Sequence, residues 1–186
     1  MPDGGKFTEA DFEQVIMTSL YTSGGYERRG RDTYNAELSL IPRNTLSYIE
    51  STQHDLWYSL VQAVKGEEAA ERKLVGALCD KRKKDGTLSL LRTGFSIGTI
   101  HFSVIGWKPD SQKGESAWEK DGADIFTCLN QVEGDRKLRN PAVPDVVLFV
   151  NGIPIVTMEL KYEPIGQDVT DAEAQYRARN TSEPLF

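Results

Sequence analysis

Apolar residues recur at helical spacing through the first half of the chain and predict three helical regions. The first follows a capping-box pattern, Thr8-x-x-Asp11, and ends at the Gly24-Gly25 pair. The second has Pro42 just ahead of it, which suits a helix entry, and a break near residues 53–55. The three regions run over about residues 8–24, 44–64 and 67–79. We therefore expect residues 1–86 to be a mainly helical part.

After Gly86 the pattern changes to short runs rich in β-branched and aromatic residues, which predict strands. A polar stretch and a helical stretch accompany them. The predicted strands cover residues 88–95, 97–107, 125–132, 146–150 and 155–160. The polar loop covers residues 108–124. The helix covers residues 164–180, and its helical pattern is strongest at 171–179. Helices followed by strands and a closing helix indicate an α+β or mixed-sheet α/β fold. We expect a single domain over residues 1–186, with its sheet in residues 87–186.

Length and charge narrow the possible functions. The 186 residues suffice for one sizeable core, but a formal net charge of −6 has the wrong sign for general attraction to a polyphosphate. Contact with nucleic acid therefore needs a metal ion or a local basic patch. The run from Lys81 to Lys84 is either such a patch or a solvated helix face.

Cysteine usage and hydropathy exclude further classes. Two cysteines without a CxxC pair, and only two histidines, argue against a structural zinc site. No apolar run approaches the ~20 residues of a membrane span, and the N-terminus lacks the pattern of a signal peptide. We expect a soluble, cytoplasmic protein with no membrane partner.

The segment from Pro144 to Lys161 carries the candidate chemistry. Five consecutive apolar residues, 146–150, suit a strand covered on both faces, and Asn151-Gly152 is a strong hairpin signal. In the second strand, alternation places Glu159 and Lys161 on one face. Burying both charges costs several kcal/mol, on the order of the penalty for unpaired buried ions, unless each has a partner.

The pairing register of this hairpin decides whether Asp145 joins them. A two-residue loop sets Asp145 opposite Met158 and puts the two carboxylates on opposite faces, whereas a three-residue loop or a bulge sets Asp145 opposite Glu159. We predict the second register. Two carboxylates about 5 Å apart, with a lysine nearby, then form a divalent-cation site.

Such a site suits the hydrolysis of phosphodiester bonds. Asp145, Glu159 and a backbone carbonyl such as that of Leu160 hold Mg²⁺, with Mn²⁺ as the alternative, and the ion neutralises the phosphate and acidifies a water. Lys161 stabilises developing charge or orients the water. Two other acidic-x-Lys triplets, at residues 71–73 and 135–137, lack this strand context and are expected to be solvated surface.

The pattern Pro-Asp, thirteen residues, Glu-Leu-Lys resembles the PD-(D/E)xK nuclease motif. The string from Leu148 to Lys161 is similar to the N-terminal nuclease domain of the type I restriction endonuclease R subunit, as are further short stretches. Those stretches are residues 12–14, 24–26, 38–50, 52–53, 91–94 and 175–177. The resemblance implies a restriction-endonuclease-like core in which Asp145 and Glu159 are metal ligands and Lys161 is the catalytic lysine.

The resemblance also implies accessory residues. It assigns Glu13 as an additional metal ligand. Related nucleases often carry Gln-x-x-x-Tyr on the next helix; here Tyr176 matches the tyrosine, Ala172 stands at the glutamine position, and Gln175 is the neighbour of Tyr176. Gln175 and Tyr176 are therefore accessory candidates.

The implied activity is that of a type I site-specific deoxyribonuclease, a hydrolase that cuts double-stranded DNA with Mg²⁺. In this family an ATP-driven motor follows the nuclease domain, and methyltransferase and specificity subunits are partners. No phosphate-loop motif occurs in this sequence, so we expect a fragment of a longer chain. Two alternatives stay open: a non-catalytic nuclease-fold module for DNA contact or docking, and another PD-(D/E)xK enzyme such as a repair nuclease or a resolvase.

Overall fold

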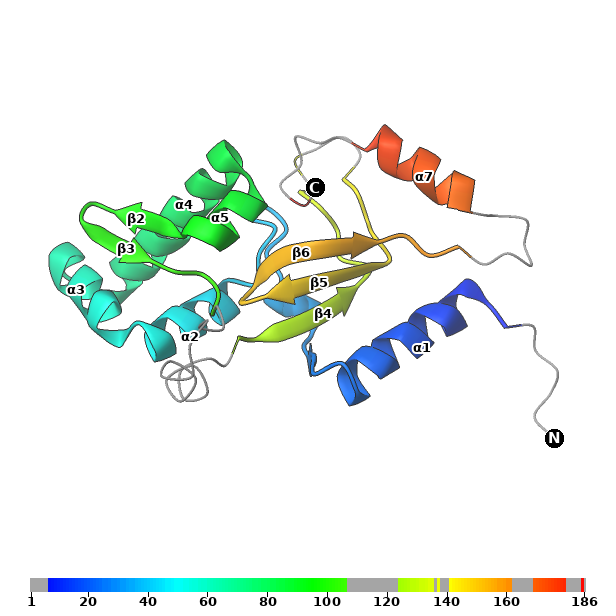
Figure 1. Ribbon diagram of the computed structural model, residues 1–186, viewed down its shortest axis with the longest axis horizontal. Coiled ribbons are helices and arrows are strands. Elements are labelled where there is room, and N and C mark those ends of the chain that lie inside the picture. Colours follow the sequence, from blue (N-terminus) through cyan, green and yellow to red (C-terminus); the bar gives the residue numbers. More distant parts are fainter. Residues whose placement is uncertain are drawn as a thin grey trace. The chain divides into compact units, whose positions relative to one another are not determined.

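The structure is a computed structural model that describes residues 7–106, 124–135, 137, 141–161, 169–179 and 185. It contains α-helices, a mixed sheet and a small hairpin (Figure 1), which confirms the predicted α/β class. The helices are α1 (Glu9–Thr22), α2 (Pro42–Thr52), α3 (His54–Val64), α4 (Glu67–Asp85), α5 (Thr87–Thr93) and α7 (Val169–Ala178), with a 3₁₀ turn η1 (Arg31–Thr33). The strands are β1 (Glu27–Arg28), β2 (Phe95–Ile97), β3 (Ile100–Phe102), β4 (Phe126–Asn130), β5 (Val146–Val150) and β6 (Ile153–Met158).

The chain divides into two compact units. The sheet unit comprises Met1–Ser39, Phe126–Phe149 and Pro154–Phe186, and the helical unit comprises Leu40–Ile125 and Val150–Ile153. Among the described residues, no helix is both long and apolar enough to cross a membrane. The predicted loop over residues 108–124 lies outside the described residues except for Asp124.

The four-stranded sheet has the order β1-β4-β5-β6. The short edge strand β1 runs parallel to β4, with Arg28 paired to Cys128. At the end of β4 the Gln131 amide donates to the Asp145 carbonyl ahead of β5 (3.0 Å), so these strands meet antiparallel. Figure 1 shows β5 between β4 and β6. The carboxyl ends of β1, β4 and β6 and the amino end of β5 therefore point the same way.

Helix α1 covers one face of this sheet with an apolar stripe. The predicted capping box is confirmed, because Thr8 Oγ1 accepts from the Asp11 amide while the Asp11 carboxylate accepts from the Thr8 amide. Buried residues from helix and strands form one cluster, which Leu160 joins from beyond β6. The cluster consists of Met17, Cys128, Val146, Leu148 and Leu160. All five residues of β5 are buried, as the apolar run 146–150 predicts.

The helical unit confirms one prediction and corrects another. The break predicted near residues 53–55 lies at Gln53, whose side-chain amide bonds the backbone of Ser103 through both of its polar atoms. Residues 88–95, predicted as a strand, instead form helix α5 followed by the first residue of β2. Gly86 and Gly94, with positive φ of 83° and 61°, bracket this helix, and its leucines are good helix formers. The predicted strand over residues 97–107 is interrupted by the turn between β2 and β3, which pair antiparallel.

The β5–β6 turn is a two-residue loop made of Asn151 and Gly152, both with positive φ (48° and 80°). This backbone is that of a type I′ hairpin turn, the geometry that Asn-Gly favours. The Asn151 side chain is fully buried and bonds the Ile125 amide, the Val104 carbonyl and the Asp124 carboxylate. The Gly152 carbonyl accepts from the Ile41 amide (2.9 Å). The turn is therefore a buried, fully bonded part of the helical unit.

Replacing Gly152 with alanine should destabilise the protein strongly. A Cβ at Gly152 lies 2.2 Å from the Ile41 carbonyl oxygen, and the positive φ adds strain. We expect a loss of about 3 kcal/mol in the free energy of unfolding, measured by urea denaturation. Gly76→Ala is the matched control, because a Cβ there meets nothing within 4 Å and the site is inside α4. That variant should gain up to about 1 kcal/mol; equal effects of the two substitutions would contradict the packing of the turn.

Candidate functional site

Asp145 lies just before β5 and is 9% exposed. Its Oδ2 atom accepts from the Leu160 amide (2.6 Å), and its Oδ1 atom accepts from the side-chain amide of Gln131 (3.0 Å). Two well-made hydrogen bonds satisfy part of the carboxylate and fix its orientation. Asp145 is thus held between the end of β4 and the residues that follow β6.

The predicted register of the hairpin is wrong. The loop has two residues, and the Asp145 amide donates to the Met158 carbonyl (3.0 Å), so Asp145 pairs with Met158 and not with Glu159. The inference that this register separates the carboxylates is wrong as well. Alternation of faces holds only inside a strand, and β6 ends at Met158, so the chain from Glu159 onward is free to turn back toward Asp145.

Glu159 lies between two cations, Lys161 and Arg179. Its side chain is 9% exposed and lies 3.6 Å from Lys161 Nζ, measured to Oε1, while Oε2 accepts from the Arg179 guanidinium. Burial first and the nearby Asp145 charge second raise the pKa of Glu159 above its ordinary value, and Arg179 and Lys161 partly offset that rise. The carboxylates of Asp145 and Glu159 thus lie in the same poorly hydrated site.

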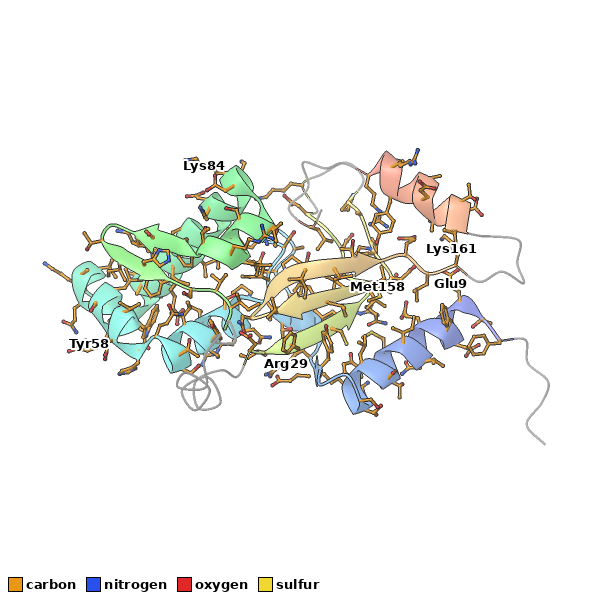
Figure 2. All side chains as sticks on the ribbon, viewed as in Figure 1. Glu9, Arg29, Tyr58, Lys84, Met158 and Lys161 are labelled. Carbon is orange, nitrogen blue, oxygen red and sulfur yellow. The ribbon has the colours of Figure 1, made fainter. Side chains whose placement is uncertain are left out.

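Lys161 and Leu160 follow β6 directly, and Figure 2 shows Lys161 beyond Met158 at the end of that strand. Lys161 is 12% exposed, so its ammonium is largely withdrawn from water and faces Glu159. Leu160 is 8% exposed; its side chain belongs to the core and its amide holds Asp145. The structure therefore brings the three predicted catalytic residues together at one end of the sheet.

Glu13 connects to this group through amide side chains. Gln131 Nε2 donates to Glu13 Oε2 (2.8 Å) as well as to Asp145, and Asn130 Nδ2 donates to Glu13 Oε1 (2.5 Å). Gln131 has a positive φ of 50°, an uncommon conformation for a residue with a side chain. This conformation ends β4 and turns the amide between the two carboxylates. The metal role of Glu13 stays a prediction.

Helix α7 adds a second cation. Tyr176 donates to Thr157 Oγ1 on β6 (3.1 Å), and the Arg179 guanidinium lies 4.7 Å from the centre of the Tyr176 ring. Arg179 then reaches Glu159 from one helical turn further on. Tyr176 therefore lies beside the site through Arg179, whereas Gln175 is exposed and its accessory role stays a prediction.

Sequence reasoning missed Asn130, Gln131 and Arg179. Asn130 and Gln131 are polar residues that end an otherwise apolar strand, a pattern that often marks a functional strand end. Arg179 lies one helical turn beyond Tyr176, so a helix docked through that tyrosine also presents the arginine. Neither signal assigns these residues to the site until the order of the strands is known.

The donor set fits a hard divalent cation in part. Asp145 and Glu159 supply carboxylate oxygens, the ligands that Mg²⁺ prefers, and each Asp145 oxygen retains a lone pair beyond its one hydrogen bond. Within the described ranges, no three side chains of His, Cys, Asp or Glu are grouped closely enough to hold a metal ion by themselves. Mg²⁺ commonly binds through one or two carboxylates and keeps several waters, so two carboxylates are a sufficient protein contribution.

Together these features define a mixed α/β protein with a buried pair of carboxylates and two cations at one end of its sheet. The family model described as type I restriction enzyme R protein N terminus (HSDR_N) matches residues 6–186, and the chain belongs to this family. Comparisons with curated proteins and with solved structures gave no match.

The pKa of Glu159 should respond in opposite directions to its two kinds of neighbour. Asp145→Asn removes a repelling charge and should lower this pKa, while Arg179→Ala removes an attracting charge and should raise it further. The measurement is the carboxyl ¹³C shift of Glu159 against pH in metal-free buffer. Arg177→Ala is the control, since Arg177 pairs with exposed Glu173 on the same helix. A pKa that ignores both Asp145 and Arg179 would refute the shared site.

Proposed function

We propose that the chain is a nuclease module that hydrolyses phosphodiester bonds of double-stranded DNA with the help of Mg²⁺, within a type I restriction enzyme. The family match supports the setting, and one observation carries the chemistry: Asp145 and Glu159 are buried beside each other with Lys161 at 3.6 Å from Glu159. Burying two like charges together is costly, and it is repaid where a divalent cation or a substrate uses them.

In this proposal Asp145, Glu159 and the Leu160 carbonyl would hold Mg²⁺, with Mn²⁺ as a substitute. The bound ion would supply charge neutralisation at the phosphate and an acidified water. Asp145 is pre-oriented by the Leu160 amide and by Gln131, so little reorganisation is needed on binding. Lys161 donates to the attacking water or to the phosphate oxygen on which negative charge grows.

The choice of DNA sequence and ATP-driven movement would belong to other parts of the restriction complex. Methyltransferase and specificity subunits are the partners that the family implies, and a motor domain would supply the use of ATP. This division matches a site whose charged groups are carboxylates and cations, because such groups contact the phosphate backbone, which is the same for every sequence.

A non-catalytic module for DNA contact or docking is the second candidate, and Arg179 favours it. Arg179 and Lys161 together neutralise Glu159 without any metal ion, as a purely structural ion-pair cluster would. The two functions differ in whether a divalent cation displaces Arg179 from Glu159. Metal binding and cleavage therefore separate them.

Substitutions at the site should abolish cleavage. In the restriction complex that contains this chain, Asp145→Asn or Lys161→Ala should lower DNA cleavage by about 100-fold or more, measured with plasmid DNA and Mg²⁺. ATP hydrolysis by the same complex should stay unchanged, since no motor residue is altered.

The chain offers its own control for that experiment. Glu71→Gln with Lys73→Ala changes an acidic-x-Lys triplet of the same kind on α4, outside the sheet unit. This double variant should cut DNA as the unchanged complex does. Normal cleavage by the Asp145 variant would reject the proposed function.

Divalent cations should bind the purified chain weakly but measurably. In calorimetry with Mn²⁺, Asp145→Asn and Glu159→Gln should each weaken binding by about tenfold or more, because each removes a carboxylate ligand. Arg179→Ala should strengthen binding, because it removes the cation that competes for Glu159. Equal affinity in all four proteins would support the structural ion-pair cluster instead.

A further inference from the structure

A second cluster of cations lies on the sheet unit away from the carboxylates. Arg28 ends β1, Arg29 follows it, and Arg31 comes after Gly30 at the start of η1; all three arginines are exposed. They line a cavity of about 400 Å³ together with Gln14 and Asn130. In a chain of net charge −6 these three guanidinium groups outnumber the two acidic residues that flank them, Glu27 and Asp32. We call this cavity the arginine groove.

The groove has the donors that bind phosphate, and the two carboxylates bonded to its lining residues, Glu13 and Glu27, already have hydrogen-bond partners. Guanidinium groups are typical partners of phosphate oxygens, whereas the side-chain amides of Gln14 and Asn130 each already donate to a neighbour, Thr18 and Glu13 respectively. Arg28 lies 5.9 Å from the centre of the Tyr21 ring, which supports its planar head group. Glu27 pairs with Arg29 (2.6 Å), so Arg28 and Arg31 contribute most.

Hydrogen bonds tie this groove to the candidate active site. Arg31 donates to Asn130 Oδ1 (3.3 Å), Asn130 and Gln131 both donate to Glu13, and Gln131 also donates to Asp145. In the sheet, β1 and β5 are separated by β4 alone, two strand spacings of about 4.8 Å each. Figure 2 shows Arg29 beside β4 and Lys161 beyond the end of β6. A ligand that contacts both places therefore spans at least two strand spacings and carries negative charge opposite the arginines.

We propose that the arginine groove binds the phosphate backbone of duplex DNA and holds it in register with the carboxylate pair. The choice of DNA rests on the proposed function, but the groove itself rests on Arg28, Arg29, Arg31 and their cavity. Binding at the groove uses no metal ion and no carboxylate. It supplies the backbone contacts that an acidic protein otherwise lacks.

The test is binding of a short fluorescein-labelled duplex to the purified chain in EDTA, followed by anisotropy at several salt concentrations. The triple variant Arg28→Gln, Arg29→Gln, Arg31→Gln should lose about tenfold or more in affinity at low salt. The slope of log affinity against log salt should become shallower by about 1.8, because Arg28 and Arg31 each account for about 0.9 while Arg29 is paired with Glu27.

The matched control removes three exposed cations from the helical unit: Lys83→Gln, Lys84→Gln and Arg92→Gln. This control should change affinity less than twofold. An equal loss in both triple variants, an unchanged slope in the arginine variant, or no duplex binding by the unchanged chain would overturn the proposal. Binding of polyglutamate as tight as that of the duplex would also overturn it, in favour of an acidic protein partner.

Two further variants distinguish a folding defect, and a failure of the proposed function, from a failure of the groove proposal. If circular dichroism shows that the triple variant is unfolded, Arg28→Gln alone, at an exposed position, should still make the slope shallower by about 0.9. Asp145→Asn should bind the duplex in EDTA at least as tightly as the unchanged chain does, because it removes a negative charge that repels phosphate. Loss of cleavage with intact binding in that variant supports the proposed function, whereas normal binding by the folded arginine variants defeats the groove alone.

Discussion

Two carboxylates buried close together at one end of a sheet are the constraint around which the sheet unit is arranged. Asp145 and Glu159 repel each other and have little water to screen them, which raises the pKa of Glu159. The surrounding polar groups offset that repulsion by stabilising the negative charges. The Leu160 amide and Gln131 donate to Asp145, and Lys161 and Arg179 face Glu159. These donors come from β4, from the chain after β6 and from α7, so the packing of three separate segments depends on one electrostatic requirement.

The sheet supplies this arrangement because several chain ends coincide there. Asp145 precedes β5, Glu159 follows β6 and Gln131 follows β4, and the antiparallel order of these strands places all three at the same edge. A residue just outside a strand is not bound by the alternation of faces. This freedom explains how a two-residue turn, which separates side chains at positions 145 and 159 inside an ideal hairpin, still permits their meeting. The type I′ turn and the shared carboxylate site are therefore compatible.

Local patterns predicted much of the fold, and non-local pairing limited the rest. The capping box at Thr8, the break at Gln53 and the apolar run 146–150 are signals carried by neighbouring residues, and the structure confirms each. The prediction of a strand over residues 88–93 was wrong, because a short leucine-rich run suits either a strand or a helix. The two flanking glycines, with positive φ, bound a helix here. The motif located Asp145, Glu159 and Lys161, whereas Gln131 and Arg179 belong to the site only through strand order and the docking of α7, which no local pattern encodes.

Charge balance connects the site to a polyanionic substrate in an acidic protein. Glu13, Asp145 and Glu159 contribute three formal negative charges to the linked hydrogen-bond network, and Lys161 and Arg179 contribute two formal positive ones, so the formal charge of the cluster is −1. This charge attracts a divalent cation and repels a bare phosphate. With a divalent cation in place the formal charge of the cluster would be +1, which a single phosphodiester group neutralises. Such a site would engage DNA only after the ion is bound, so the backbone contacts that bring DNA near must come from cations elsewhere on the protein, as Arg28, Arg29 and Arg31 are proposed to provide.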